Sequence, residues 1–308
     1  MLWSERFTEI LSDWRGLAEL TTLGIGGAAR YFLEPRSTAE LAEVVAALGK
    51  AGVPVFWLGN GSKLLIDDAG VEGAVVSLRR LQGIRRGADP DGTEVEAEAG
   101  VRLPHLLAWT IRLGLAGLER CAGIPGTVGG ALSKNAGGAH GSFGDVLVSA
   151  TVVAPDGRVE TRDSSLLGLG YRSSRLNGAV VAAVRLRLAP DEPRAISARA
   201  RALMDHRKAT QPLQDRTAGC IFVNPSGGRS AGRLLDEVGM KGRQRGRASI
   251  SEKHANFVIN QGGALAREVR DLIREGHDRV LGRFGVSLDL EIVEWPRPAV
   301  VCQGQLER

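Results

Sequence analysis

The feature that most constrains this chain is a glycine-rich run at Gly123–Gly138, which reads G-I-P-G-T-V-G-G-A-L-S-K-N-A-G-G. Glycine lets the backbone approach a ligand closely, and peptide N–H groups without flanking side chains form anion sites. A second such run, Leu58–Leu64 (L-G-N-G-S-K-L), follows the apolar stretch Val53–Leu58. Two loops of this kind predict a diphosphate held from two sides, as in a dinucleotide cofactor.

Neither loop matches the commoner phosphate-binding motifs. Neither has the G-x-x-x-x-G-K-[ST] pattern, which disfavours a P-loop nucleoside triphosphatase, and Ile25–Arg30 (I-G-G-A-A-R) lacks the G-x-G-x-x-G pattern of a Rossmann fold. The alternative, that both runs are ordinary turns, stays open. It is the less favoured one because Ser62, Thr127 and Asn135 supply polar side chains among the glycines.

Composition limits the class of protein. A length of 308 residues allows two or three domains, and 43% hydrophobic residues indicate a globular chain. No apolar run approaches the roughly 18 residues of a membrane span, and the first ten residues do not resemble a secretory signal. Three scattered cysteines, Cys121, Cys220 and Cys302, disfavour a disulfide scaffold or a metal site, so we expect no metal and a cytoplasmic location.

The net charge of +5 includes one local basic cluster, Lys241–Arg247 (K-G-R-Q-R-G-R). The favoured interpretation is a solvated loop, and the alternative is attraction for an anionic nucleotide. Nucleic acid is not an expected partner because no aromatic residues interleave with this cluster. We expect no membrane partner either, and the sequence leaves the oligomeric state open.

Periodicity predicts mixed helices and strands without an internal repeat. Ser37 and Glu40 form a capping-box pattern before apolar residues at helical spacing. Alternation around Val95 predicts a strand with one wet face. The remaining expected strands are 53–58, 146–153, 158–161, 179–188, 220–223, 256–260 and 288–293, and the remaining expected helices are 103–113, 195–208, 230–238 and 264–283.

Seven segments in order resemble one family. A-G-I-P-G-T-V-G-G-A with N-A-G, within Ala122–Gly137, is similar to a signature of the UDP-N-acetylenolpyruvoylglucosamine reductase (MurB) family. The other six motifs are Thr21–Ala28, Leu58–Gly70, Gly170–Ser174 (G-Y-R-S-S), Gln211–Pro225, Ser251–Gly263 and Leu288–Ile292 (L-D-L-E-I). The resemblance covers roughly 21–292.

The resemblance implies an α+β fold: a two-part FAD-binding module of the vanillyl-alcohol-oxidase (PCMH) type over 1–190, split near 73–80, then an α+β substrate-binding domain over 191–308. It implies noncovalent FAD, NADPH as hydride donor and a UDP-sugar substrate. The implied reaction reduces the enolpyruvyl group to give UDP-N-acetylmuramate for peptidoglycan precursors. Two alternatives stay open: another FAD-dependent oxidoreductase on the same module, or a non-catalytic UDP-sugar or flavin-binding protein.

The resemblance also implies roles for single residues. Arg172 matches the family's stabilising arginine, and a guanidinium suits a developing enolate. Glu291 matches the catalytic glutamate, with Asp289 expected on the same strand face. Cys220 stands where most relatives have a proton-donating serine, and a thiol, with a reference pKa of about 8.5, is the stronger acid. Asn224 is expected to contact the substrate diphosphate.

Cofactor contacts are expected from both glycine runs. Lys63 departs from the asparagine usual in the family, so its ammonium group either pairs with the flavin diphosphate or points away while backbone binds the phosphate. Val223 replaces a lysine that usually precedes Asn-Pro. The residues expected to bind FAD are Gly59, Asn60, Gly61, Ser62, Lys63, Gly123, Ile124, Pro125, Gly126, Thr127, Gly129, Gly130, Asn135, Ala136 and Gly137.

Overall fold

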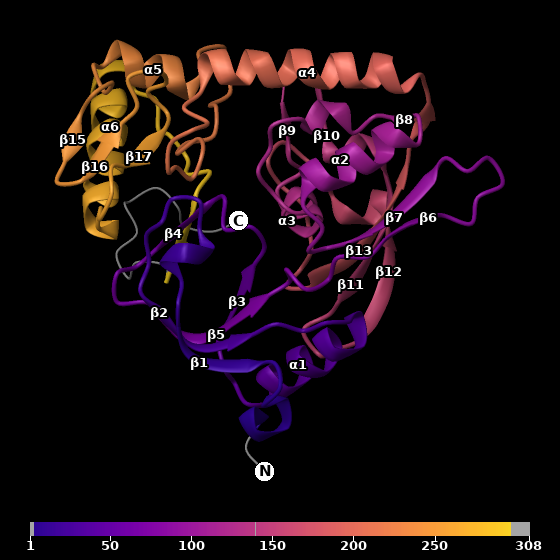
Figure 1. The fold of residues 1–308 in the computed structure, drawn as a ribbon. Helices are drawn as coiled ribbons and strands as arrows, with labels where there is room; N and C mark the ends of the chain where they lie inside the picture. Colours follow the sequence, from indigo (N-terminus) through magenta and orange to yellow (C-terminus); the bar gives the residue numbers. More distant parts are fainter. Residues whose placement is uncertain (1–2, 139, 297–308) are drawn as a thin grey trace. The chain divides into compact units, whose positions relative to one another are not determined.

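A computed structural model describes residues 3–138 and 140–296 (Figure 1). The chain forms two compact units, each assembled from three segments. Unit 1 comprises 1–13, 31–60 and 73–210, and unit 2 comprises 14–30, 61–72 and 211–308. Each unit has its own hydrophobic core: residues such as Leu41, Val95 and Phe143 fill that of unit 1, and residues such as Leu65 and Phe222 fill that of unit 2.

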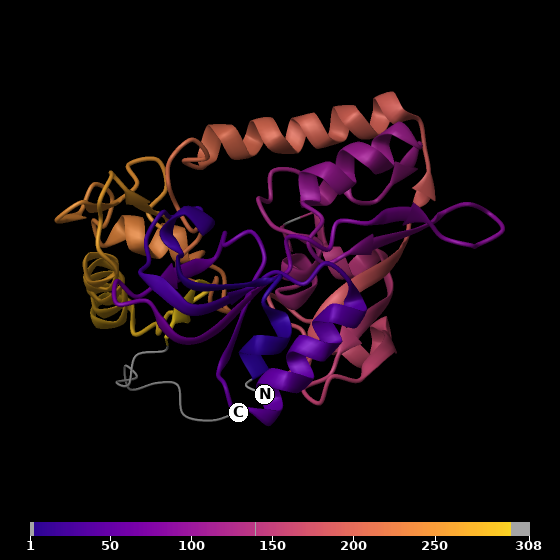
Figure 2. The same ribbon diagram turned by 60° about the horizontal axis from the view of Figure 1, so that its bottom comes forward.

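A five-stranded antiparallel sheet with the order β12-β11-β13-β7-β6 is the main element of unit 1 (Figure 1). Helix α2 packs beside the long helix α4, and both views of the ribbon show the two side by side (Figure 2). The elements are β6 (Ile84–Arg86), β7 (Glu94–Glu98), α2 (Leu103–Arg112), β8 (Leu115–Ala116), α3 (Val128–Ser133), β9 (Gly137–Gly138), β10 (Gly141–Ser142), β11 (Leu147–Val153), β12 (Val159–Asp163), β13 (Val180–Arg187), β14 (Ala189–Pro190) and α4 (Pro193–Thr210).

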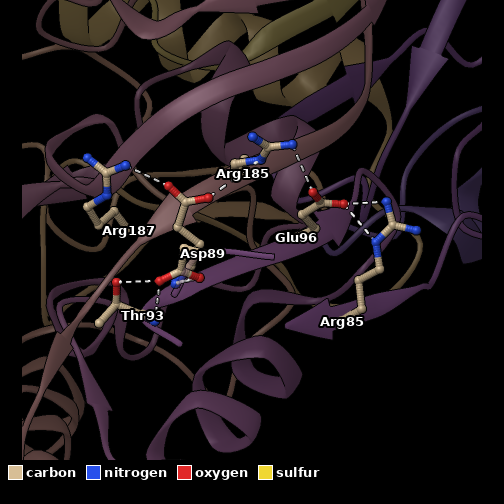
Figure 3. A network of polar contacts seen from close by, with 7 residues as sticks. Arg85, Asp89, Thr93, Glu96, Arg185 and Arg187 are labelled. Atoms are coloured by element: carbon tan, nitrogen blue, oxygen red, sulfur yellow. Dashed lines mark hydrogen bonds and ion pairs between the residues drawn. The ribbon is translucent and has the colours of Figure 1, made fainter. Parts of the chain in front are cut away.

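Strand β7 has the predicted apolar and polar faces. Val95 and Ala97 are buried, whereas Glu96 lies between two arginines, with Arg85 Nε 2.7 Å from Oε2 and Arg185 Nη2 3.1 Å from Oε1 (Figure 3). Glu94 is itself buried because Arg187 Nη2 contacts its Oε1 at 2.6 Å. The charged network thus covers one face of the sheet, while the opposite face contributes to the core.

The N-terminal part of the chain contains a second sheet, with the order β1-β2-β5-β3. Its elements are β1 (Leu11–Gly16), β2 (Ala28–Leu33), β3 (Val55–Leu58) and β5 (Val71–Ser77), and helix α1 (Thr38–Lys50) precedes β3. Within unit 1, β3 pairs in parallel with the end of β5, in the register Val55 with Ala74. Strands β1, β2 and β5 each contain a residue at which the chain passes from one unit to the other.

The predicted start of α1 is confirmed, with one difference. Ser37 is the N-cap, and its hydroxyl accepts a hydrogen bond from Glu40 N at 3.1 Å. The Glu40 carboxylate, however, accepts from Arg36 N at 2.5 Å instead of from the N-cap itself. The cap therefore satisfies two backbone donors, one of which lies before the helix.

We expect Ser37→Ala to lower the free energy of unfolding by about 1 kcal/mol, because the Glu40 N–H would lose its side-chain acceptor. Urea denaturation followed by circular dichroism measures the effect. Ser12→Ala, at an exposed position of β1, is the control. A Ser37→Ala midpoint equal to that of the control would show that water replaces the serine at no cost.

Unit 2 combines short strands with two helices. Its described elements are β4 (Leu64–Ile66), α5 (Ala231–Glu237), β15 (Gln244–Arg245), β16 (Ala248–Ile250), β17 (Val258–Asn260), α6 (Ala266–Phe284) and β18 (Val293–Trp295). Strand β18 runs parallel to β4, and β15, β16 and β17 form an antiparallel sheet. The 3₁₀ helices of the chain are η1 (Trp3–Phe7), η2 (Ala18–Leu20), η3 (Glu119–Cys121), η4 (Phe143–Val146) and η5 (Ser164–Leu167).

Two predicted strands of unit 2 were wrong. Residues 220–223 form isolated bridges, Cys220 with Phe257 and Phe222 with Leu290, and no continuous ladder. The last strand begins at Val293, so Asp289 and Glu291 do not share a strand face. The alternation predicted for 288–292 is only partly present, because Leu290 is exposed. The two segments do exchange backbone hydrogen bonds, from Val223 N to Asp289 and from Glu291 N and Ile292 N to Ile221, but these do not form a regular ladder.

The compact units are divided differently from the predicted domains. Helix α4, which follows the expected boundary at residue 190, belongs to unit 1, and unit 2 includes 14–30 and 61–72 from the N-terminal half. A boundary in sequence cannot describe this arrangement because each unit is discontinuous. Among the described residues, no helix is both long and apolar enough to cross a membrane.

Candidate functional site

Within unit 1, the start of the first glycine-rich run, 58–60, lies against the second run. Asn60 Nδ2 donates to the Pro125 carbonyl at 2.5 Å. A Cβ atom at Gly59 would lie 2.7 Å from Thr127 Oγ1, so this close approach requires glycine. Arg79 Nε donates to the Gly59 carbonyl at 3.0 Å, and burial lowers the pKa of this guanidinium. The partly buried Arg79 cation therefore contacts the backbone of the first loop, and a positive charge at this position suits an anionic ligand.

The glycines of the second run differ in what surrounds them. Gly129 packs on Ala99, whose Cβ would be 2.9 Å from a Cβ at that position, and Gly123 is covered by Arg207 and Met204. Gly137 approaches the backbone of Gly141 and Ser142, so it also serves packing.

Gly126 and Gly130 are open by comparison. A Cβ at either would meet nothing closer than 3.8 and 3.5 Å, respectively. No side chain packs closely over Gly126, whereas the Gly130 N–H donates to the buried Thr127 hydroxyl at 3.4 Å, which caps helix α3. This arrangement fits the diphosphate of a dinucleotide cofactor. The binding of a cofactor by individual residues of this run stays a prediction.

Asn135, expected among the cofactor contacts, uses its side chain inside the protein. Its Nδ2 donates to the Gly170 carbonyl at 3.0 Å, and its Oδ1 accepts from Gly144 N at 2.9 Å. Ser174 Oγ adds a bond to the Ser133 carbonyl at 3.0 Å. The end of the glycine-rich run is thereby fastened to the segment that contains Arg172.

Arg172 lies at the tip of a tight turn. Gly170 and Ser173 exchange two backbone hydrogen bonds around it, and Arg172 has a φ of +55°. A left-handed backbone is uncommon for a residue other than glycine and persists only where the surroundings fix it. The guanidinium carbon lies 5.5 Å from the centre of the Tyr171 ring, at a favourable cation–π distance. The turn sets where the Arg172 side chain leaves the backbone, and the exposed Tyr171 ring lies beside its guanidinium.

Cys220 and Glu291 lie on neighbouring segments of unit 2. Ile221, which follows Cys220, accepts from Glu291 N at 2.8 Å through its carbonyl. On its other side, this second segment continues into β18, where Val293 N donates to the Lys63 carbonyl at 2.7 Å. Three stretches distant in sequence, around residues 63, 221 and 291, are therefore side by side.

Lys63 joins the two predicted catalytic residues. Its Nζ is 2.8 Å from Glu291 Oε1 and donates to the Cys220 carbonyl at 3.2 Å. The Glu291 side chain is 10% exposed and that of Lys63 is 30% exposed, so the pair is shielded from much of the solvent. Of the two interpretations of Lys63, this geometry favours the one in which backbone, and not the ammonium group, contacts the flavin phosphates.

Asn224 and the basic cluster take other positions. Asn224 is exposed, and its Oδ1 accepts from Ala231 N at the start of α5. Within the cluster, Lys241 pairs with Asp236 at 2.8 Å, and Arg245 pairs with Glu275 at 2.7 Å. Acids of the same unit thus partly neutralise this loop, which favours the solvated-loop interpretation over attraction for a nucleotide.

Sequence reasoning missed two buried asparagines that support the site. Asn256 is paired through both atoms of its amide with the backbone of Phe222, at 2.9 and 2.8 Å. Asn260 donates to the carbonyls of Leu23 and Gly24 and accepts from Ala264 N. Both lie in the apolar segment H-A-N-F-V-I-N. An asparagine among apolar residues needs internal hydrogen-bond partners, and this signal could have identified the two residues from the sequence.

Known proteins resemble the chain along most of its length. An FAD binding domain model matches residues 29–162, and the C-terminal domain of UDP-N-acetylenolpyruvoylglucosamine reductase matches residues 211–295. UDP-N-acetylenolpyruvoylglucosamine reductase 2 of Symbiobacterium thermophilum is 42% identical over 89% of both chains, and the enzyme of Moorella thermoacetica is 42% identical over 91% of both. The crystal structure of the Thermus caldophilus enzyme has 37% identity and a TM-score of 0.79, covering 93% of this chain and 98% of that one.

The open glycine loop of unit 1, together with the matching domain model, defines a flavoprotein with an FAD-binding module. The predicted fold class, this module of the vanillyl-alcohol-oxidase type followed by an α+β domain, is confirmed. Because relatives match nine-tenths of its length, the chain belongs to the UDP-N-acetylenolpyruvoylglucosamine reductase family.

Proposed function

We propose that this chain reduces the enolpyruvyl group of UDP-N-acetylenolpyruvoylglucosamine with NADPH, giving UDP-N-acetylmuramate for peptidoglycan precursors. FAD held by the two glycine-rich loops would supply the hydride chemistry between NADPH and C3 of the enolpyruvyl group. The observation that carries the proposal is the meeting of Cys220, Glu291 and Lys63 in unit 2, in a chain whose relatives are named as this reductase.

The protein residues act on the charge and the proton. Hydride addition at C3 leaves negative charge at C2, next to the substrate carboxylate. We assign the stabilisation of that charge to Arg172, which stands in a tight turn with its guanidinium beside the Tyr171 ring. A preorganised cation stabilises developing charge without reorganising during the reaction.

One proton must then reach C2 to complete the product. We assign its delivery to Cys220 as donor, with Glu291 beside it to hydrogen-bond the intermediate or assist the transfer. The thiol of Cys121 is a poor alternative, since it is 4% exposed and burial raises its pKa to about 11. Asn224 is assigned to the substrate diphosphate.

The partners are small molecules, NADPH and the UDP-sugar. We place the reaction in the cytoplasm, because three scattered cysteines suit a reducing compartment. Nucleic acid and membranes are not assigned as partners.

Purified protein is expected to be yellow and to release FAD, and no FMN, on heat denaturation, because the two loops suit a diphosphate. Chromatography of the released flavin against both standards measures this. Turnover of NADPH with the enolpyruvyl UDP-sugar, absent without that substrate, tests the reaction. Bound FAD with turnover of a simple alcohol or sugar instead would assign another oxidoreductase, and ligand binding without any turnover would assign a non-catalytic role.

A further inference from the structure

We propose that Lys63 is a positioning residue for the proton-delivery step: its ammonium group holds the Glu291 carboxylate and the Cys220 segment in register. The inference rests on the proposed function of these two residues. Lys63 lies in a glycine-rich loop that is expected to bind the cofactor, but its side chain is assigned here to the reaction of the substrate.

The Lys63 ammonium group contacts two segments at once. Its Nζ lies 2.8 Å from Glu291 Oε1 and 3.2 Å from the Cys220 carbonyl. A charge-assisted hydrogen bond of this length is among the stronger polar contacts in a protein. The lysine thereby contacts the carboxylate of one residue assigned to proton delivery and the backbone of the other.

A glycine makes space for the lysine ammonium group. Gly219 has a φ of +74°, and a Cβ at this position would lie 3.1 Å from Lys63 Nζ. Gly219 precedes Cys220, so the residue that allows the close approach belongs to the same segment that the lysine contacts. The backbone of Lys63 is also fixed, because its carbonyl accepts from Val293 N at 2.7 Å.

The Glu291 residue is held through both its backbone and its carboxylate. It lies before strand β18, which begins at Val293, and its backbone N–H donates to the Ile221 carbonyl at 2.8 Å. The Lys63 ammonium group contacts the carboxylate itself, at 2.8 Å. A shielded ion pair is costly to form unless its geometry is good, which makes it a poor choice for stability alone.

The test compares Lys63→Met, which removes the charge at similar length, with Lys63→Arg, which keeps it. The matched control is Lys241→Met, because Lys241 also makes a 2.8 Å ion pair in unit 2 and its side chain is 35% exposed. Stopped-flow kinetics follow the two half-reactions separately. Flavin titration of the apoprotein measures FAD affinity independently of activity.

We expect Lys63→Met to slow reoxidation of the reduced enzyme by the UDP-sugar about ten- to a hundredfold, since misplacing a reacting group by about 1 Å has costs of this order. FAD affinity should stay within about tenfold of the parent, and reduction by NADPH should be unchanged. Lys63→Arg should recover part of the lost rate, and Lys241→Met should behave as the parent. The Lys63→Met effect should appear in kcat and leave KM for the UDP-sugar nearly constant.

A double-mutant cycle with Glu291→Gln separates positioning from general structure. Lys63→Met should add nothing to the slow reoxidation of Glu291→Gln. In the apoprotein, the two substitutions should be coupled about tenfold in the unfolding equilibrium constant. Additive effects on both readouts would overturn the inference.

Three further outcomes would also decide whether the inference about Lys63 holds. If Lys63→Met is reoxidised at the parental rate while Glu291→Gln is reoxidised slowly, the inference about Lys63 is wrong and the proposed function stands. Loss of FAD affinity by much more than tenfold with normal reoxidation at saturating FAD returns Lys63 to the cofactor. A parental protein that does not reduce the UDP-sugar overturns the proposed function, and the inference falls with it.

Discussion

Arg172→Ala is expected to slow reoxidation of the reduced enzyme by the enolpyruvyl UDP-sugar by about two to three orders of magnitude, since a preorganised charged group is lost where charge develops. Reduction by NADPH should remain nearly intact, because no charge forms at C2 in that half-reaction. Stopped-flow absorbance of the flavin resolves the two steps. The same split is expected for Glu291→Gln.

Two further variants make the Arg172 result specific. Arg172→Lys keeps the charge but loses the planar fork of donors, so it should recover only part of the rate. Arg175→Ala removes an arginine three residues further along, which packs over Gly168 instead of standing in the turn, and should leave both steps close to the parental rates. Equal slowing of the two half-reactions in Arg172→Ala would mean that the arginine shapes the fold of its turn and does not act on the intermediate.

Cys220→Ala should form product about a hundredfold or more slowly, because removing a positioned general acid has effects of this size. Cys220→Ser should remain active, since a hydroxyl group can also donate a proton. Turnover in deuterated solvent, followed by NMR of the product, measures how fast and on which face deuterium enters at C2. Parental turnover by Cys220→Ala would assign the proton to water or to Glu291.

Alkylation provides an independent check on Cys220. The experiment uses a Cys302→Ser background, because that cysteine lies outside the described residues. Cys121 should be spared near pH 8, since burial raises its pKa to about 11 and little thiolate is present. A thiol reagent should therefore inactivate the parental background and spare the Cys220→Ser variant. Inactivation of both would place the sensitive group elsewhere.

The sequence predicted the elements that depend on local signals. The cap at Ser37, the alternation around Val95 and the helix that follows residue 264 were all visible in periodicity and capping residues. The segments around Cys220 and Glu291 were predicted as strands and are not, because single bridges to distant partners produce the same alternation. Local patterns do not reveal which distant segment completes a ladder.

The candidate site was predictable in residue type and less so in arrangement. Arg172, Cys220 and Glu291 came from family motifs, and their roles stay predictions. Lys63 and Glu291 form an ion pair although they are 228 positions apart in the sequence (291 − 63), so no local motif could indicate the contact. The same holds for the hydrogen bond from the Asn135 side-chain amide to the Gly170 carbonyl, which spans 35 residues.

The unequal surroundings of the glycines in the second run matter for anyone redesigning this loop. A library that randomises Gly126 and Gly130 changes positions where an added Cβ makes only ordinary van der Waals contacts, and it therefore explores what the loop can hold. A library that randomises Gly129 and Gly137 forces side chains into neighbouring backbone and mainly samples proteins that fold poorly. Tolerance to substitution along this run should therefore depend on how closely each glycine is packed, and not on how many glycines the run contains.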